Sequence, residues 1–77
     1  MYVIKVNNMF LNYNELVGTI YFSDRFIDPN SENPENWHDA TCLFTTMVEA
    51  SKAICNEEFW FIMSNGWNNI KIDIMKF

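Results

Sequence analysis

The sequence predicts an α+β domain in which a small antiparallel sheet packs against one helix, in the order strand, strand, strand, helix, strand. Three observations predict this fold: short segments rich in β-branched and aromatic residues, one amphipathic segment with a capping signal, and a final segment of alternating isoleucines. With 77 residues, of which 49% are hydrophobic and 17% aromatic, the chain forms a single domain, residues 1–77, rather than a disordered segment.

Three segments before the helix are interpreted as strands. Residues 2–6 form the first, and residues 16–22 form the second, with Gly18 as a bulge or a point of close packing. Residues 9–13, between these two, are interpreted as a turn or a short strand. Residues 39–44 form a third, short strand, which we expect beside the second.

A helix is predicted to begin after Thr46. The sequence Thr46-Met-Val-Glu49 matches a capping box, in which the threonine oxygen accepts a backbone hydrogen bond and the glutamate returns one. The apolar residues that follow fall on one broad face at helical spacing, and Asn65-Gly66 offers a left-handed cap. We therefore favour one continuous helix over residues 46–65.

Two residues within this helix depart from the amphipathic pattern. Glu58 falls on the apolar face and Trp60 on the polar face, which leaves open an alternative in which the helix stops near Asn56 and residues 59–63 form a strand. The chain closes with a strand over residues 68–77, where isoleucines at 70, 72 and 74 alternate with charged residues.

The negative charge is concentrated in one segment of the chain. Residues 24–39 hold five acidic residues and Arg25, a net charge of −4 out of a total of −5. Two prolines interrupt helical structure here, so the segment is interpreted as an acidic loop. Such a surface repels nucleic acid and predicts a basic protein as its partner. The candidate contact residues are these acids and a neighbouring tryptophan: Asp24, Asp28, Glu32, Glu35, Asp39 and Trp37.

No residue pattern predicts catalysis, a metal site or a cofactor, so we do not expect an enzyme. His38, Asp39 and Cys42 lie close together, but zinc needs three or four ligands, and Cys55 has no cysteine partner at the required spacing. Both thiols are expected to face the core, where a thiol is unreactive. Residues 28–39 resemble the first ligands of an EF-hand but lack its glycine, its final glutamate and a preceding helix.

The sequence also predicts a cytoplasmic protein without a membrane anchor. Its longest apolar run, residues 59–63, is far shorter than the roughly 20 residues that span a bilayer. The first residues lack the layout of a signal peptide, and two cysteines are too few for a disulfide framework.

The acidic segment, the passage from strand to capped helix over residues 40–50 and the isoleucine-rich end resemble small acidic proteins of phages and mobile elements, among them anti-CRISPR proteins. Those proteins share no common motif, so the resemblance transfers no functional residue. It implies a non-enzymatic inhibitor in the bacterial cytosol, presenting carboxylates where a host protein, such as a CRISPR effector, receives phosphates.

Three functions are compatible with these residues. We favour an inhibitor that binds a nucleic-acid-handling protein through the acidic loop, with Trp37 as its apolar anchor; a homodimer is compatible with this function. The alternative is a self-assembling structural or regulatory module, in which Phe10, Tyr21 and Trp60 cover the open sheet face with a second copy. A third, a small-molecule or metal sensor, rests on His38, Cys42 and the acidic loop.

Overall fold

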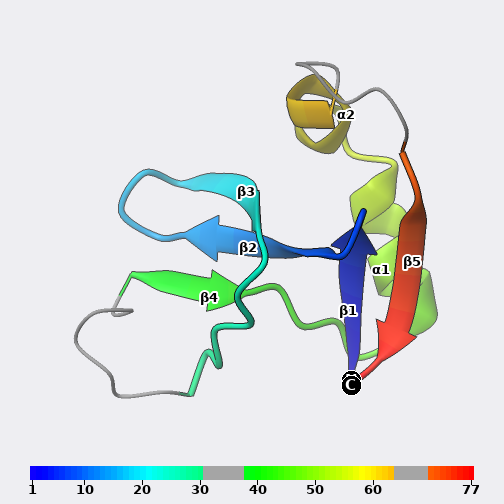
Figure 1. Cartoon of the computed structure of the whole chain (residues 1–77), viewed down its shortest axis with the longest axis horizontal. Helices are drawn as coiled ribbons and strands as arrows, with labels where there is room; N and C mark the ends of the chain where they lie inside the picture. The colour runs from blue at the N-terminus through cyan, green and yellow to red at the C-terminus, as the bar shows by residue number, and fades with distance from the viewer. Residues whose placement is uncertain (31–37, 64–69) are drawn as a thin grey trace.

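The computed structural model describes residues 1–30, 38–63 and 70–77, and the α+β class with an antiparallel sheet is confirmed (Figure 1). In chain order the elements are β1 (Tyr2–Val6), β2 (Met9–Asn14), β3 (Thr19–Ser23), β4 (Asp39–Thr41), α1 (Met47–Ile54), α2 (Glu57–Met63) and β5 (Ile72–Lys76).

The sheet is built around β2, which has strands along both edges. The strand order is β3-β2-β1-β5, and β4 pairs with the second half of β2, beyond the point where β1 leaves it. All pairings are antiparallel. Figure 1 shows β1 and β5 running crosswise to β2, β3 and β4, so the sheet has two differently oriented parts.

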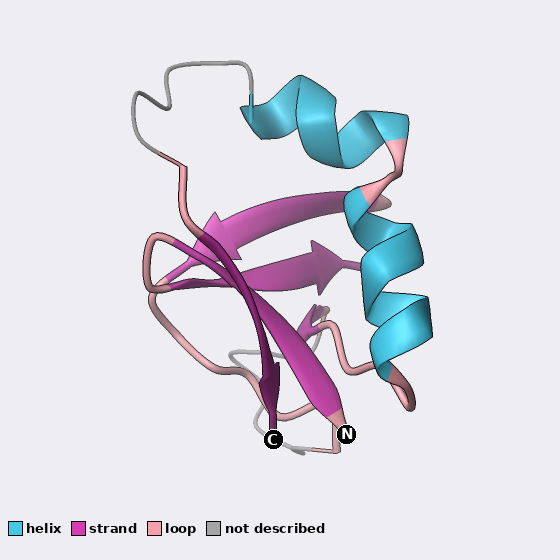
Figure 2. Cartoon of the chain, turned by 90° about the vertical axis from the view of Figure 1, so that its right-hand side faces the viewer, coloured by secondary structure: helices cyan, strands magenta, loops and turns pink. Residues whose placement is uncertain are grey.

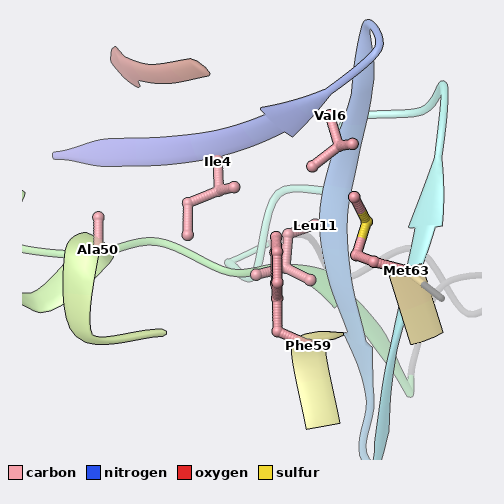
Figure 3. Close-up of a cluster of buried hydrophobic side chains, with 6 residues drawn as sticks. All are labelled: Ile4, Val6, Leu11, Ala50, Phe59 and Met63. Atoms are coloured by element: carbon pink, nitrogen blue, oxygen red, sulfur yellow. The ribbon is translucent and has the colours of Figure 1, made fainter. Parts of the chain in front are cut away.

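Both helices lie on the same side of the sheet and supply half of the core (Figure 2). The ring of Phe59 is completely buried and meets Phe22 of β3 edge-to-face, with the ring centroids 5.6 Å apart. Figure 3 shows the central cluster between the sheet and the helices, which comprises Ile4, Val6, Leu11, Ala50, Phe59 and Met63.

The prediction of one continuous helix is wrong, because α1 ends at Ile54, and the helix end near Asn56 that the alternative expected is confirmed. The strand that the alternative placed over residues 59–63 is wrong, because these residues belong to α2. The predicted cap at Thr46 is confirmed, since its Oγ1 accepts a hydrogen bond from the Glu49 amide at 3.1 Å. The Glu49 carboxylate accepts hydrogen bonds from Thr45 instead of Thr46. The Thr45 hydroxyl donates at 2.6 Å and the Thr45 amide at 3.3 Å. The expected helix end at residues 65 and 66 lies outside the described residues.

The break between α1 and α2 explains the two residues that did not fit one helix. Asn56 caps the N-terminus of α2: its Oδ1 accepts a hydrogen bond from the Glu58 amide at 2.8 Å. The change of direction buries Phe59 and leaves Trp60 47% exposed. Glu58 remains exposed and accepts a hydrogen bond from the Ile20 amide of β3 at 3.4 Å, which protects that strand edge.

The strands also differ from the prediction in position and pairing. Residues 15–18 form a turn, so the second predicted strand begins only at Thr19, and residues 9–14 are a full strand. β4 pairs with β2, not with the strand over residues 19–23 as expected. It ends at Thr41, and β5 begins at Ile72 instead of residue 68.

The sheet face opposite the helices is partly covered by the same chain, which weakens the premise of the self-assembly alternative. Since side chains alternate along a strand, Phe10 points away from the core face that Leu11 occupies. The Phe26 ring packs against Phe10 edge-to-face at 5.6 Å and stacks on Phe77 at 4.4 Å between centroids. The segment over residues 24–30 therefore folds back over this face.

Candidate functional site

The predicted acidic loop comprises the segment over residues 24–30, the first residue of β4 and residues that the structure does not describe. Asp24 and Asp28 are exposed in the segment over residues 24–30, and Asp39 is the first residue of β4. The other candidate residues, Glu32, Glu35 and Trp37, lie outside the described residues.

A buried polar network anchors the segment that carries Asp24 and Asp28. The Thr41 hydroxyl accepts a hydrogen bond from the Ile27 amide at 2.8 Å and donates one to Asn12 Oδ1 at 2.7 Å. Asn12 Nδ2 in turn donates to the Arg25 carbonyl at 3.3 Å, and the Thr41 amide donates to the Ile27 carbonyl at 2.9 Å. Asn12 and Thr41 are the two buried polar residues of the described ranges.

This network fixes the backbone at Arg25 and at Ile27, which is 5% exposed, between the two exposed aspartates. Asp28 makes a local turn, with its Oδ1 accepting a hydrogen bond from the Asn30 amide at 2.9 Å. No role was predicted for Asn12 from the sequence, and its burial was therefore missed. The signal was its position in the middle of an apolar segment, Met9-Phe-Leu-Asn-Tyr13.

Asp39 has structural partners within the sheet. Its Oδ1 accepts a hydrogen bond from Asn14 Nδ2 at 2.6 Å, across the register pair that joins β2 and β4. It also accepts a hydrogen bond from Tyr21, and the pKa of that phenol is raised, first by burial and then by the Asp39 carboxylate. Asp39 therefore fixes the start of β4 as well as contributing charge.

The net charge is concentrated in one part of the chain. Six acidic residues and Arg25 lie between Met9 and Thr41, which gives that range the whole net charge of −5. The rest of the chain has four lysines and four acidic residues and is neutral. The described residues of this range include Glu15, Asp24, Asp28 and Asp39 against Arg25, a net charge of −3. Figure 1 shows β2, β3 and β4 on one side and β1, β5 and α1 on the other.

The tip of the β2–β3 hairpin, residues 15–18, is a feature that sequence reasoning placed within a strand. Leu16 and Val17 are 72% and 71% exposed, the highest values among the large hydrophobic residues that the structure describes. Asn14 closes the turn: its Oδ1 accepts from the Val17 amide at 2.9 Å and its carbonyl from the Gly18 amide at 2.8 Å. Asn14 followed four positions later by Gly18 was the signal for this turn.

The two cysteines differ in environment, and only one faces the core as expected. Cys42 lines a cleft of about 200 Å³ between the sheet and the helix junction, and burial raises the pKa of its thiol to about 11. Cys55 is exposed at the end of α1, which corrects its predicted burial. Within residues 1–30, 38–63 and 70–77, no group of three or more His, Cys, Asp or Glu residues is placed to hold a metal ion.

No family model, curated protein or solved structure matches the chain. Over the part that the structure describes, no helix has the length and apolar character required to cross a membrane. The interpretation of the site therefore depends on its own geometry and charge.

Proposed function

We propose that the protein is a non-enzymatic inhibitor that binds the basic, nucleic-acid-binding surface of another protein. The observation that supports this proposal is the charge separation, with a net charge of −5 between Met9 and Thr41 and none elsewhere. A surface of this kind attracts Lys and Arg clusters and repels nucleic acid itself. The partner we propose is a host nucleic-acid-handling protein, such as a CRISPR effector, with the inhibitor encoded by a phage.

The anchoring of the acidic segment favours this function over a merely solvated surface. The hydrogen bonds of Thr41 fix the backbone between Asp24 and Asp28, so these carboxylates lose less freedom when they bind a partner. Carboxylates held at fixed positions can occupy the places where a basic surface receives phosphates. Charge attraction of this type speeds association and weakens as salt increases.

The self-assembly alternative is not favoured, because it was based on an open sheet face. Phe10, one of the residues expected to cover that face in a dimer, packs against Phe26 of the same chain. Tyr21 forms hydrogen bonds within the sheet, and Trp60 belongs to α2.

The test is affinity capture from lysates of several bacteria, washed at low and at high salt, with the retained proteins identified by mass spectrometry. We expect a nucleic-acid-handling protein that is retained at low salt and released at high salt. The purified protein should then lose its binding to nucleic acid at one equivalent of inhibitor. Unchanged nucleic-acid binding by the captured protein would contradict the proposal.

Two matched variants separate a specific acidic surface from total charge. Asp24→Asn with Asp28→Asn removes two charges from the acidic part and keeps the hydrogen-bond acceptor at position 28. Glu57→Gln with Asp73→Asn removes two charges from the neutral part, on α2 and β5. We expect the first pair to weaken binding and its salt dependence and the second to leave both unchanged. Equal effects of the two pairs would show that only total charge matters.

A further inference from the structure

We infer that the hairpin tip, residues 15–18, is the apolar anchor that inserts into a nonpolar cleft on the basic target protein. The inference rests on the proposed function and gives Leu16 and Val17 the anchoring role that the sequence suggested for Trp37. It names a surface and the chemistry of its partner: a cleft with a nonpolar floor and Lys or Arg at its rim.

The fold does not require the side chains of Leu16 and Val17. The turn is closed by the side chain and carbonyl of Asn14 and by Gly18, whose φ of +74° suits glycine. Both aliphatic side chains are more than 70% exposed, and neither belongs to the core cluster. Covering two such adjacent side chains with a partner releases water from a substantial apolar area.

Several hydrogen bonds constrain the backbone of the tip. Besides the two hydrogen bonds to Asn14, the Glu15 amide donates to the His38 carbonyl at 2.8 Å, which ties the turn to the residue before β4. Val17 is β-branched and has few side-chain conformations to lose. An anchor that is already ordered loses little entropy when it enters a cleft.

Acidic residues next to the tip favour a target cleft with basic residues at its rim. Glu15 is part of the turn, and the Asp39 carboxylate lies 2.6 Å from the Asn14 side chain that closes it. Glu15 thus precedes Leu16 directly, and Asp39 contacts the residue that closes the turn. Figure 1 shows this end of β2 and β3 as the end farthest from α1 and β5. A basic rim around a nonpolar floor complements this arrangement.

A second exposed apolar surface, on α1, does not fit the same partner. Met47 and Val48, on the outer side of α1, are 51% and 64% exposed and line a shallow depression together with Lys52. A lysine at that place opposes a basic target. This pair therefore provides a control of similar exposure and size.

The experiment compares two double variants in their affinity for the captured target protein. We expect Leu16→Ser with Val17→Ser to weaken binding by about 30-fold or more, the loss typical of a binding hot spot. Met47→Ser with Val48→Ser should change it by less than about twofold, and circular dichroism should show both variants folded. A photo-crosslinking residue at position 17 should attach to the target next to basic residues.

The outcomes separate this inference from the proposed function. If the tip variant binds like the unchanged protein while Asp24→Asn with Asp28→Asn loses binding, the inference is wrong and the proposed function stands. If the unchanged protein self-associates and the tip variant does not, a second copy occupies the tip and the inference is wrong. If no lysate yields a nucleic-acid-handling protein, the proposed function fails and the inference fails with it.

Discussion

At the scale of single residues, Thr41 connects the site to the fold. Its hydroxyl is buried and serves both the Ile27 amide and the side chain of Asn12. A buried polar group without a partner is costly, so each of these groups depends on the other two. The position of the acidic segment over residues 24–30 therefore depends on a threonine in the sheet.

We predict that Thr41→Val destabilises the protein by about 2 kcal/mol, because the Ile27 amide and Asn12 Oδ1 lose their shared partner. For a chain of this length the melting temperature should fall by about 10 °C, measured by thermal unfolding followed by circular dichroism. Thr41→Ser keeps the hydroxyl and should recover most of the loss. Thr19→Val, at an exposed position of β3, is the control; an equal loss there would refute the role of the network.

The two cysteines should differ in reactivity by about tenfold or more. The thiolate is the reactive form, and burial raises the pKa of the Cys42 thiol to about 11, whereas Cys55 is exposed at the end of α1. We expect iodoacetamide at pH 8 to alkylate Cys55 first and Cys42 only after denaturation, as followed by mass spectrometry. Faster labelling of Cys42 would contradict the protection that its half-buried position gives the thiol.

The same pKa predicts a pH dependence of stability. The folded protein holds the Cys42 proton more tightly than the unfolded chain, so the stabilisation is complete below about pH 9 and is lost as the pH rises towards about 11. Urea unfolding at pH 8 and pH 10 should show this loss. In Cys42→Ala the decline should be smaller than in Cys55→Ala, and identical declines would exclude Cys42 as its source.

At the scale of elements, the sequence predicts which segments are regular better than it predicts where they break. The Thr46 cap, β1 and the terminal isoleucine strand follow from local patterns that the structure keeps. The helix break does not, because an arc of apolar residues is compatible with a straight helix until the sheet determines where Phe59 must lie. The order of the strands likewise depends on contacts between distant residues, such as the Asn14–Asp39 pair.

The break between the helices provides an element-scale prediction. Asn56→Ala removes the side chain that accepts from the Glu58 amide and should cost about 1 kcal/mol of stability, the usual loss of a helix cap. Asn56→Asp keeps an acceptor and adds a charge that suits a helix N-terminus, so its stability should equal or exceed that of the unchanged protein. Urea denaturation measures both. If the alanine variant is as stable as the unchanged protein, α2 does not depend on this cap.

At the scale of the whole molecule, part of the site could be predicted from sequence and part could not. The acidic segment was found by summing formal charges along the sequence, which requires no knowledge of the fold. It could not show that Asp39 is a strand residue with two side-chain partners, or that Ile27 ties Asp24 and Asp28 to the sheet. The exposure of Leu16 was also hidden, since an apolar Leu-Val pair before Gly18 is equally typical of a buried strand.

Charged and apolar contact residues should affect different rates of binding. Charges on one side of a molecule act over about 10 Å at 0.1 M salt and therefore speed the approach of a basic partner before contact. Apolar anchors act only after contact and set how slowly the complex separates. Asp24→Asn with Asp28→Asn should thus lower the association rate about three- to tenfold at low salt and change dissociation by a smaller factor, because the contacts of these carboxylates with the target are weakened as well.

The hairpin variant Leu16→Ser with Val17→Ser should show the opposite pattern: an unchanged association rate and dissociation at least about tenfold faster. Surface plasmon resonance with the captured target at 0.05 and 0.5 M sodium chloride measures both rates. The difference between the charge variant and the unchanged protein should disappear at the higher salt, where exposed charges are screened, while the hairpin effect persists. A charge variant whose association rate at low salt equals that of the unchanged protein would mean that the carboxylates do not steer association.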